Sequence, residues 1–320
     1  MPAEVAQVAA VERWVEVLDD VEPVEVRESI ARCLSGEISP PLGMMQALVA
    51  TGNLDRVKVA LELVGARLTQ RRDPEALRRC REMARLLPRN AKVRAGLRAV
   101  LRESGELFVR KRDAVEAIEA CRAFFDRAVG YSEEASVALY SLGDPFLLAR
   151  ATAEVVDLLH RHQLIDRERD ILQIGCGTGR FEAALSLSVR TAVGIDVSPR
   201  MIEAAKRRCV GMGNVLLHET SGSDLSQFQD ASFDLVYAVD TFPYLVAAGE
   251  PVVVAHFRDA KRVLRPGGDF VVFNYAYGSS AERDRAEVAE RAREFGFEVV
   301  RNGEQPFSLW DGLVFHLRST

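Results

Sequence analysis

The 320-residue sequence contains few cysteines, and they are poorly placed for pairing. The five are Cys33, Cys80, Cys121, Cys176 and Cys209. They are odd in number and far apart, and none forms a Cys-x-x-Cys pair. This spacing argues against a zinc site and against a disulfide framework, and it fits a reducing compartment. We therefore expect no bound metal and a cytoplasmic location.

The sequence also lacks a long apolar segment and an excess of positive charge. No apolar run approaches the roughly 20 residues that span a bilayer. Acidic groups occur throughout the N-terminal residues, so we expect no signal peptide and no membrane partner. The formal net charge is −5, whereas polyanion-binding proteins usually carry the opposite sign. Nucleic acid is therefore not expected as a substrate.

Helical patterns follow one another through residues 1–110. Val8, Val11, Val15 and Leu18 repeat at three- and four-residue spacing, which predicts an amphipathic helix. Further helices are expected at 26–33, 42–49, 54–68, 74–87 and 91–101, separated by glycine and proline. Arginines are frequent in residues 67–98 and could form a basic patch, although a solvated helix face is the simpler interpretation. We predict a helical accessory domain over residues 1–110.

The pattern changes to strands alternating with helices from residue 169 onward. Strands are expected at 170–174, 191–195, 215–218, 233–239, 270–273, 297–300 and 313–317. This alternation predicts a parallel sheet with helices on both faces. The last two strands are joined by too short a segment for a helical crossover, so we expect them to be antiparallel. With linking helices at 114–129 and 146–160, the second domain is predicted over residues 111–320.

A glycine-rich turn, ILQIGCGTG at residues 171–179, is the strongest functional signal. Glycines at 175, 177 and 179 let a ligand lie close over the backbone, where a side chain would collide with it. Free amides at the start of the next helix can donate hydrogen bonds to that ligand. A nicotinamide dinucleotide fingerprint would require glycine where Arg180 stands, so that cofactor is not favoured.

Two acidic residues follow the next strands at positions suited to a nucleoside. Asp196 ends the second strand, where a carboxylate can accept hydrogen bonds from both ribose hydroxyls. Capping of the next helix is the alternative role, but Ser198 before Pro199 already fits that position. Asp224 follows the third strand, and it could accept the exocyclic amine of adenine or cap a turn.

Five segments together resemble the class I (Rossmann-like) S-adenosyl-L-methionine (SAM)-dependent methyltransferase family over residues 125–320. They are LQIGCGTGRF, VGIDVSPRMIEAAKRR, SGSDL, SFDLVYAVD and RVLRPGGDFVVFN. The resemblance implies an α/β fold whose seven-stranded, mostly parallel sheet has the order 3-2-1-4-5-7-6, with strand seven antiparallel. It also implies that the protein is an enzyme, a methyltransferase, with SAM as its cofactor.

The resemblance further assigns residues to the cofactor. They are Gln173, Gly175, Cys176, Gly177, Gly179, Asp196, Val197, Met201, Asp224, Leu225, Val239 and Tyr131. Asp224 and Leu225 would flank adenine, and Val239 and Asp240 would approach the methionine end. The family usually has an acidic residue where Gln173 stands, so Asp240 could take over the cofactor's ammonium group. Tyr131 is our preferred lid residue among Phe124, Phe125, Tyr131 and Tyr140.

The methyl acceptor is less constrained, because transfer from a sulfonium needs alignment more than acid–base chemistry. The candidate catalytic residues are Asp240, Tyr244 and Tyr275, at the C-terminal ends of strands four and five. Phe242, Asn274 and Tyr277 lie in the same segments, and core packing is the alternative role for the aromatic side chains. His218 and His256 are weaker candidates for a base, and His256 is expected to point outward.

We predict methyl transfer to an O or N atom of a small-molecule acceptor whose identity the sequence does not reveal. Two alternatives remain open: a non-catalytic SAM sensor or scaffold, and a protein-directed methyltransferase. The helical domain is expected to cover the site or to support a homodimer.

Overall fold

The computed structural model describes residues 13–88, 90–107 and 113–320, which form two compact units. The first contains the described residues up to Glu106 together with Tyr131–Ala151 and Ser308–Trp310. The second contains the rest of the described chain. This grouping differs from a single boundary at residue 110, because it assigns two later segments to the first unit. Independent folding of residues 111–320 stays a prediction.

The first unit is built from helices. They are α2 (Val15–Leu18), α3 (Val24–Ser35), α4 (Pro40–Thr51), α5 (Leu54–Arg71), α6 (Pro74–Arg85), α7 (Ala91–Leu107), α9 (Glu133–Val137) and the 3-10 helix η1 (Leu139–Ser141). Ser39 and Asp73 each accept a backbone N–H of the first turn at the start of α4 and α6, and proline occupies that turn in both. The predicted helix near residues 5–18 falls largely outside the described residues.

The arginine-rich stretch of the first unit is extensively paired with carboxylates. Arg78 forms ion pairs with Glu75 and Glu82 on α6. Arg94 and Arg98 of α7 both pair with Asp55 of α5. These pairs are exposed, so each stabilises the fold by only about 0–1 kcal/mol. They favour a solvated, charge-balanced helix face over a basic patch.

The second unit contains a seven-stranded sheet in the order β3-β2-β1-β4-β5-β7-β6. The strands are β1 (Asp170–Ile174), β2 (Thr191–Asp196), β3 (Val215–Glu219), β4 (Phe233–Val239), β5 (Leu264–Phe273), β6 (Phe297–Glu304) and β7 (Val314–Ser319). Strands β1 to β5 pair in parallel, whereas β7 is antiparallel to both β5 and β6. The fold class, strand order and antiparallel last strand predicted from the sequence are confirmed.

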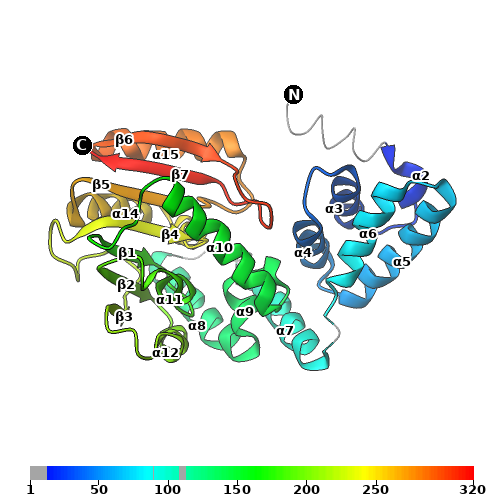
Figure 1. Cartoon of the computed structure of the whole chain (residues 1–320), viewed down its shortest axis with the longest axis horizontal. Coiled ribbons are helices and arrows are strands. Elements are labelled where there is room, and N and C mark those ends of the chain that lie inside the picture. The colour runs from blue at the N-terminus through cyan, green and yellow to red at the C-terminus, as the bar shows by residue number, and fades with distance from the viewer. Residues whose placement is uncertain (1–12, 89, 108–112) are drawn as a thin grey trace. The chain divides into compact units, whose positions relative to one another are not determined.

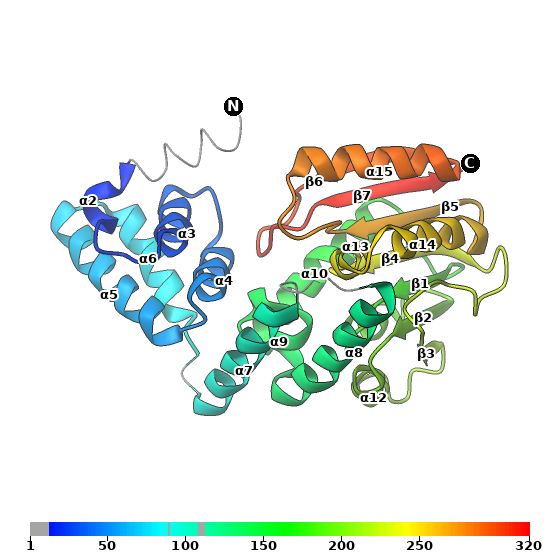
Figure 2. The same ribbon diagram turned by 180° about the vertical axis from the view of Figure 1, so that it is seen from behind.

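Helices cover both faces of this sheet (Figures 1 and 2). One face carries α14 (Glu250–Val263) and α15 (Ala281–Phe295). The other carries α11 (Arg180–Leu185) and the later part of α10 (Pro145–Arg161). Helix α12 (Pro199–Arg208) follows β2, and α8 (Ala114–Tyr131) precedes the sheet in the chain. Because strands β1, β4 and β5 are buried on both faces, their sequences are almost continuously apolar.

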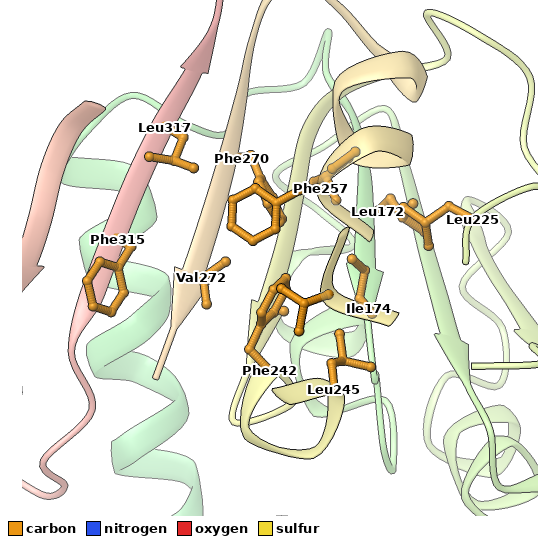
Figure 3. Close-up of a cluster of buried hydrophobic side chains, with 14 of the residues drawn as sticks. Leu172, Ile174, Leu225, Phe242, Leu245, Phe257, Phe270, Val272, Phe315 and Leu317 are labelled. Carbon is orange, nitrogen blue, oxygen red and sulfur yellow. The ribbon is translucent and has the colours of Figure 1, made fainter. Parts of the chain in front are cut away.

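Aromatic side chains dominate the core beneath α14 (Figure 3). The ring of Phe257 lies 5.4 Å from that of Phe270 and 5.7 Å from that of Phe242, centroid to centroid, both edge-on. Leu172 and Val272 of the sheet belong to the same cluster. Each such side chain contributes about 1.5–3 kcal/mol on full burial. This core fixes the positions at which the strands end, and the candidate site lies at those ends.

Helix α13 (Phe242–Ala248) was not predicted. Phe242 and Tyr244, predicted at the C-terminal end of strand four, belong to this short helix, and Pro243 stands in its first turn, where its missing N–H costs nothing. Within the described part of the chain, no helix is long and apolar enough to cross a membrane.

Candidate functional site

The glycine turn after β1 adopts a conformation that only glycine tolerates without strain. Gly175, Gly177 and Gly179 have φ angles of +70°, +54° and +70°. A Cβ at Gly175 would lie 2.2 Å from Thr241 Oγ1, and one at Gly179 would lie 2.9 Å from Ala205 Cβ. The turn therefore carries no side chains at these glycines, and substitution at either would disturb its packing.

Thr241, which the sequence analysis missed, fixes this turn from the end of β4. Its Oγ1 donates to the carbonyl oxygen of Ile174 at 3.0 Å. The contact joins residues 67 positions apart, so no local pattern signals it. It ties the glycine turn to the segment that carries Asp240.

The Asp196 carboxylate holds the glycine turn from the other side. Oδ2 accepts the N–H of Gly177 at 2.9 Å, and Oδ1 accepts the N–H of Ser198 at 2.9 Å. The side chain is only 8% exposed. Burial raises the pKa of Asp196 to about 6, and the two backbone hydrogen bonds offset part of that rise. A carboxylate can accept about four hydrogen bonds, so each oxygen keeps one lone pair for another donor.

Helix α8 packs across the ends of β2 and β3. Asp126 Oδ1 accepts from Ser198 Oγ at 2.6 Å and from the N–H of Arg200 at 3.2 Å. Ile118 lies near Gly222, since a Cβ at that glycine would be 3.1 Å from Ile118 Cγ2. Asp126 was also missed, because its partners are more than 70 residues away. Two side chains thus cap the N-terminus of α12: Ser198, which directly precedes the helix, and Asp126 of α8.

We expect Asp126→Ala to lower the free energy of unfolding by about 1 kcal/mol, the usual net value of a lost hydrogen bond. Urea unfolding followed by circular dichroism measures this change. Asp157→Ala, which removes an exposed carboxylate of α10, serves as the control. Equal stability of the two variants would mean that Asp126 does not anchor α8.

Gln173 is buried, and another side chain already uses its oxygen. The side chain is 2% exposed, and the Tyr237 hydroxyl donates to Gln173 Oε1 at 3.1 Å. The two residues are directly paired in the β1–β4 register. A contact from Gln173 to the cofactor's ammonium group stays a prediction, and it would use the second lone pair of that oxygen.

Asp240 and Asn274 follow β4 and β5, and both are in the left-handed region, with φ of +53° and +71°. Asn274 Nδ2 donates to Asp240 Oδ1 at 2.9 Å, and the Tyr277 hydroxyl approaches the same atom at 3.4 Å. Burial raises the pKa of Asp240 to about 6, and the nearby Asp311 adds to the rise. The Asn274 hydrogen bond and Arg180 lower it. Two adjacent strained non-glycine residues are typical of a functional site.

Three aromatic rings gather beside this carboxylate. The Tyr244 ring lies 5.2 Å from Phe125 of α8 and 5.9 Å from Tyr277, centroid to centroid. The interplanar angles are 76° and 90°, so neighbouring rings stand nearly perpendicular. Tyr244 is half-buried and Tyr277 is 47% exposed. Tyr244 therefore contacts Tyr277, whose hydroxyl approaches Asp240, and Phe125 belongs to the same aromatic cluster.

Tyr275 lies elsewhere, in the hydrophobic core. Its ring stacks on Phe242 at 5.9 Å, and it is 2% exposed. Because the chain leaves β5 at Asn274, strand alternation no longer decides which way the following side chains point. Tyr277, rather than the predicted catalytic candidate Tyr275, thus lies beside Asp240.

The two candidate histidines lie on different parts of the sheet unit. His256 was expected to point outward, but it is 1% exposed, and its Nδ1 lies 2.8 Å from the carbonyl oxygen of Val252. The outward orientation was therefore wrong, because α14 buries that side against the sheet. Burial also lowers the pKa of His256. His218 is exposed on β3, next to Ile195 in the register.

The residues predicted around adenine form a tight turn after β3. Asp224 Oδ1 accepts both the N–H and the hydroxyl of Ser226, at 3.0 and 2.7 Å. Leu225 is fully buried, and its N–H donates to Asp259 Oδ2 at 3.0 Å. Val197 packs against Gly222, where a Cβ would lie 2.5 Å from Val197 Cγ1. Asp224 uses one oxygen within the turn, and its role toward adenine stays a prediction.

The other predicted cofactor residues have varied environments. Cys176 is buried, and its N–H donates to the Ile195 carbonyl at 2.9 Å. Met201 is buried on α12, and Val239 ends β4 with 7% exposure. Tyr131 belongs to the first unit, where its hydroxyl donates to Glu103 at 2.9 Å. Nothing in these contacts tests a role toward the cofactor.

Of the remaining aromatic lid candidates, Tyr140 is buried and stacks on Trp310 within the first unit, with ring centroids 5.5 Å apart. Phe124 is buried edge-on against Phe125. Only Phe125 of this pair reaches Tyr244. Among the described residues, no group of three or more His, Cys, Asp or Glu side chains could hold a metal ion.

Comparison with known proteins identifies the domain that carries these features. Residues 172–272 match the methyltransferase domain family. Demethylmenaquinone methyltransferase of Tropheryma whipplei (strain Twist) is 33% identical over 108 residues, which are 34% of this chain and 42% of that protein. Phosphoethanolamine N-methyltransferase 1 of Arabidopsis thaliana is 30% identical over 131 residues, which are 40% of this chain and 25% of that protein.

A SAM-dependent methyltransferase of known structure from Aquifex aeolicus is also similar, with 19% identity and a TM-score of 0.44 over 55% of this chain and 94% of that one. The chain spans less than half the length of the two curated relatives. The domain match confirms the resemblance to SAM-dependent methyltransferases for this part of the chain, and SAM is the cofactor it implies.

Proposed function

We propose that the protein is a SAM-dependent methyltransferase that transfers a methyl group to an O or N atom of a small-molecule acceptor. One observation carries the proposal. In the domain that matches the methyltransferase family, the bare glycine turn and the Asp196 carboxylate lie within hydrogen-bond distance of each other. Glycine turn and carboxylate are the two groups that a nucleoside cofactor needs at the ends of β1 and β2.

The residues present fit this cofactor. Glycine at positions 175 and 177 keeps the turn free of side chains, and each Asp196 oxygen keeps one lone pair for a ribose hydroxyl. Asp224 and Leu225 would flank the adenine, and Val239 and Asp240 would lie near the methionine end. Bound SAM supplies an electrophilic methyl group on a sulfonium.

The chain's own contribution to transfer is alignment and electrostatics. An in-line displacement whose leaving group departs as a neutral sulfide needs an oriented nucleophile above all. Asp240, held by Asn274, and the Tyr244 hydroxyl are the polar groups at the ends of β4 and β5 that could orient it. With a pKa of about 6, Asp240 is mostly ionised at pH 7 and can accept a hydrogen bond from the acceptor.

The names of relatives support a small acceptor. They include methyltransferases for demethylmenaquinone, phosphoethanolamine and, in Caenorhabditis elegans, a sterol. Because these acceptors differ so much in chemistry, the names of the relatives do not identify the atom that is methylated. We also propose a cytoplasmic location and self-association through the helical unit, which sedimentation of the full chain would test.

We expect SAM and S-adenosylhomocysteine to bind with micromolar affinity, about −8 kcal/mol. Nicotinamide dinucleotides should not bind, because Arg180 replaces the glycine that their fingerprint needs. Isothermal titration calorimetry on the full chain measures both. Absence of heat with either sulfur ligand at millimolar concentration would contradict the proposal.

A non-catalytic SAM sensor is the second candidate, and one contact favours it. Gln173 brings no charge to the position where the family has an acidic residue, and its oxygen already accepts from Tyr237. Incubation with SAM and a fractionated metabolite extract separates the two candidates. An enzyme forms S-adenosylhomocysteine and a methylated product in some fraction, whereas a sensor binds SAM and forms neither.

A further inference from the structure

We propose that the acceptor is an amine, and that Asp240 together with the rings of Phe125, Tyr244 and Tyr277 forms a recognition site for its positive charge. This inference rests on the proposed methyltransferase function. It narrows the acceptor from an O or N nucleophile to nitrogen. The four side chains come from the end of β4, from α13, from the segment after β5 and from α8.

The carboxylate of Asp240 is held by neutral donors. Its Oδ1 accepts from the Asn274 amide and, at longer distance, from the Tyr277 hydroxyl. Among the residues that the structure describes, no Lys, Arg or His side chain forms an ion pair with Asp240. The charge of Arg180 lowers the pKa of Asp240, while its guanidinium stacks over Phe181 at 4.2 Å and donates to Thr152. A half-buried carboxylate without a paired cation is costly, and a cationic ligand would offset that cost.

The rings supply the second half of a cation site. Tyr244 stands nearly perpendicular to both Phe125 and Tyr277. These two edge-to-face contacts place Phe125, Tyr244 and Tyr277 in one aromatic cluster, whose exposed member Tyr277 also approaches Asp240. An ammonium group placed against ring faces gains about 0.5–2 kcal/mol from the ring quadrupoles, most where water is excluded. Neutral oxygen nucleophiles gain nothing comparable.

The orientation of Asp240 distinguishes the acceptor from the cofactor. Both hydrogen-bond donors to its carboxylate come from the segment after β5. The glycine turn and Asp196 lie in the opposite direction along the sheet, on β1 and β2. The donors that orient Asp240 therefore lie on the β5 side of β4, away from the groups expected to hold the nucleoside.

The movement of charge during methyl transfer also favours a nitrogen acceptor. The acceptor binds as an ammonium ion and then loses one proton to solvent, and the freed lone pair forms the N–C bond to the methyl carbon. The S–C electron pair stays on sulfur, so the positive charge moves from sulfonium to the acceptor nitrogen. A carboxylate beside that nitrogen stabilises the growing charge, whereas it would repel a phenolate or carboxylate acceptor.

Choline and its uncharged carbon analogue 3,3-dimethylbutan-1-ol test the cation site directly. They have nearly the same shape, and neither carries an amine that can be methylated. Binding is measured by calorimetry or ligand-observed NMR on the full chain saturated with S-adenosylhomocysteine. We expect choline to bind about tenfold more tightly than the alcohol. Equal binding, or binding of neither probe, would overturn the inference.

Four variants locate the site. Asp240→Asn and Tyr277→Leu should each reduce the choline preference to about threefold or less, whereas Tyr277→Phe should keep most of it because it keeps the ring. Asp230→Asn, which removes an exposed carboxylate paired with Arg262, is the matched control and should behave as wild type. Full choline preference in both Asp240→Asn and Tyr277→Leu would place the cation elsewhere.

The cofactor titration separates this inference from the function on which it rests. In folded Asp240→Asn, S-adenosylhomocysteine should still bind, and its affinity should fall by a smaller factor than the choline affinity does. If that variant instead loses S-adenosylhomocysteine and keeps choline, Asp240 serves the cofactor and the amine assignment is wrong. If wild type binds S-adenosylhomocysteine but shows no choline preference, the methyltransferase proposal stands and only the acceptor class fails.

Discussion

Replacing Asp196 by alanine should weaken S-adenosylhomocysteine binding by about 1.5–3 kcal/mol, or about 10- to 150-fold. The variant loses the expected acceptor for the ribose hydroxyls. It also loses the acceptors of the Gly177 and Ser198 N–H groups, which hold the glycine turn in place. Calorimetry on wild type and variant, each checked by circular dichroism, gives the difference.

Asp196→Asn is a milder change. Its amide oxygen can still accept one of the two backbone N–H groups, whereas its NH2 group accepts no hydrogen bond, so the other backbone contact is lost. We expect its affinity to lie between those of wild type and Asp196→Ala, and we expect the control Asp230→Asn to match wild type. A folded Asp196→Ala with wild-type affinity would mean that the ribose is held by other groups.

The glycine turn and Asp196 could be located from the sequence because the rules that place them are local. Alternation of apolar strands and helices set the strand ends, and the residues just beyond parallel strand ends must share one edge of the sheet. Strands β1 and β4 were predicted with the bounds that the structure gives. The same local rules identified the αL glycines, since only glycine fits there.

The acceptor side was predicted less well because it depends on backbone that is neither strand nor helix. Asn274 leaves β5 with a φ of +71°, and this turn sends Tyr275 into the core and leaves Tyr277 beside Asp240. No period of two or of 3.6 residues encodes that choice. Asp126 and Phe125 were missed for another reason: α8 reaches the site through tertiary packing, far from its partners in sequence.

Glu182 is a buried acid whose protonation should control stability. It is 1% exposed, and within the described part of the chain neither carboxylate oxygen has a hydrogen-bond partner. Burial raises its pKa to about 8 and the nearby Asp196 adds to this, while its own backbone N–H and Arg180 lower it. Between pH 4.5 and 8 the folded chain therefore binds one proton that the unfolded chain has released.

By linkage, the state that binds more protons loses stability as pH rises. We expect Glu182 to lower the free energy of unfolding by about 1.4 kcal/mol per pH unit, and by about 4 kcal/mol between pH 5 and 8. Asp196 acts in the same direction, but only up to its pKa of about 6. Urea unfolding at pH 5.0, 6.5 and 8.0 measures the slope.

Glu182→Met tests the assignment, because methionine has a similar volume and cannot ionise. Its stability should change much less between pH 6.5 and 8.0, and at pH 8.0 it should exceed wild type by several kcal/mol. Glu203→Met, at an exposed position on α12, should retain the wild-type slope. A wild-type slope in Glu182→Met would show that another group takes up the proton.

Glu182 should also make the affinity for the cofactor depend on pH. A Cβ at Gly194 would lie 2.8 Å from both Glu182 Oε1 and Cys176 Cβ, so the carboxyl group packs directly behind the glycine turn. Above pH 8 its ionisation places a second negative charge near Asp196, and that repulsion weakens the carboxylate's hold on the turn. S-adenosylhomocysteine affinity should therefore fall from pH 7 to 9 in wild type and stay nearly constant in Glu182→Met. Parallel losses in both proteins would assign the pH dependence to a group outside the turn.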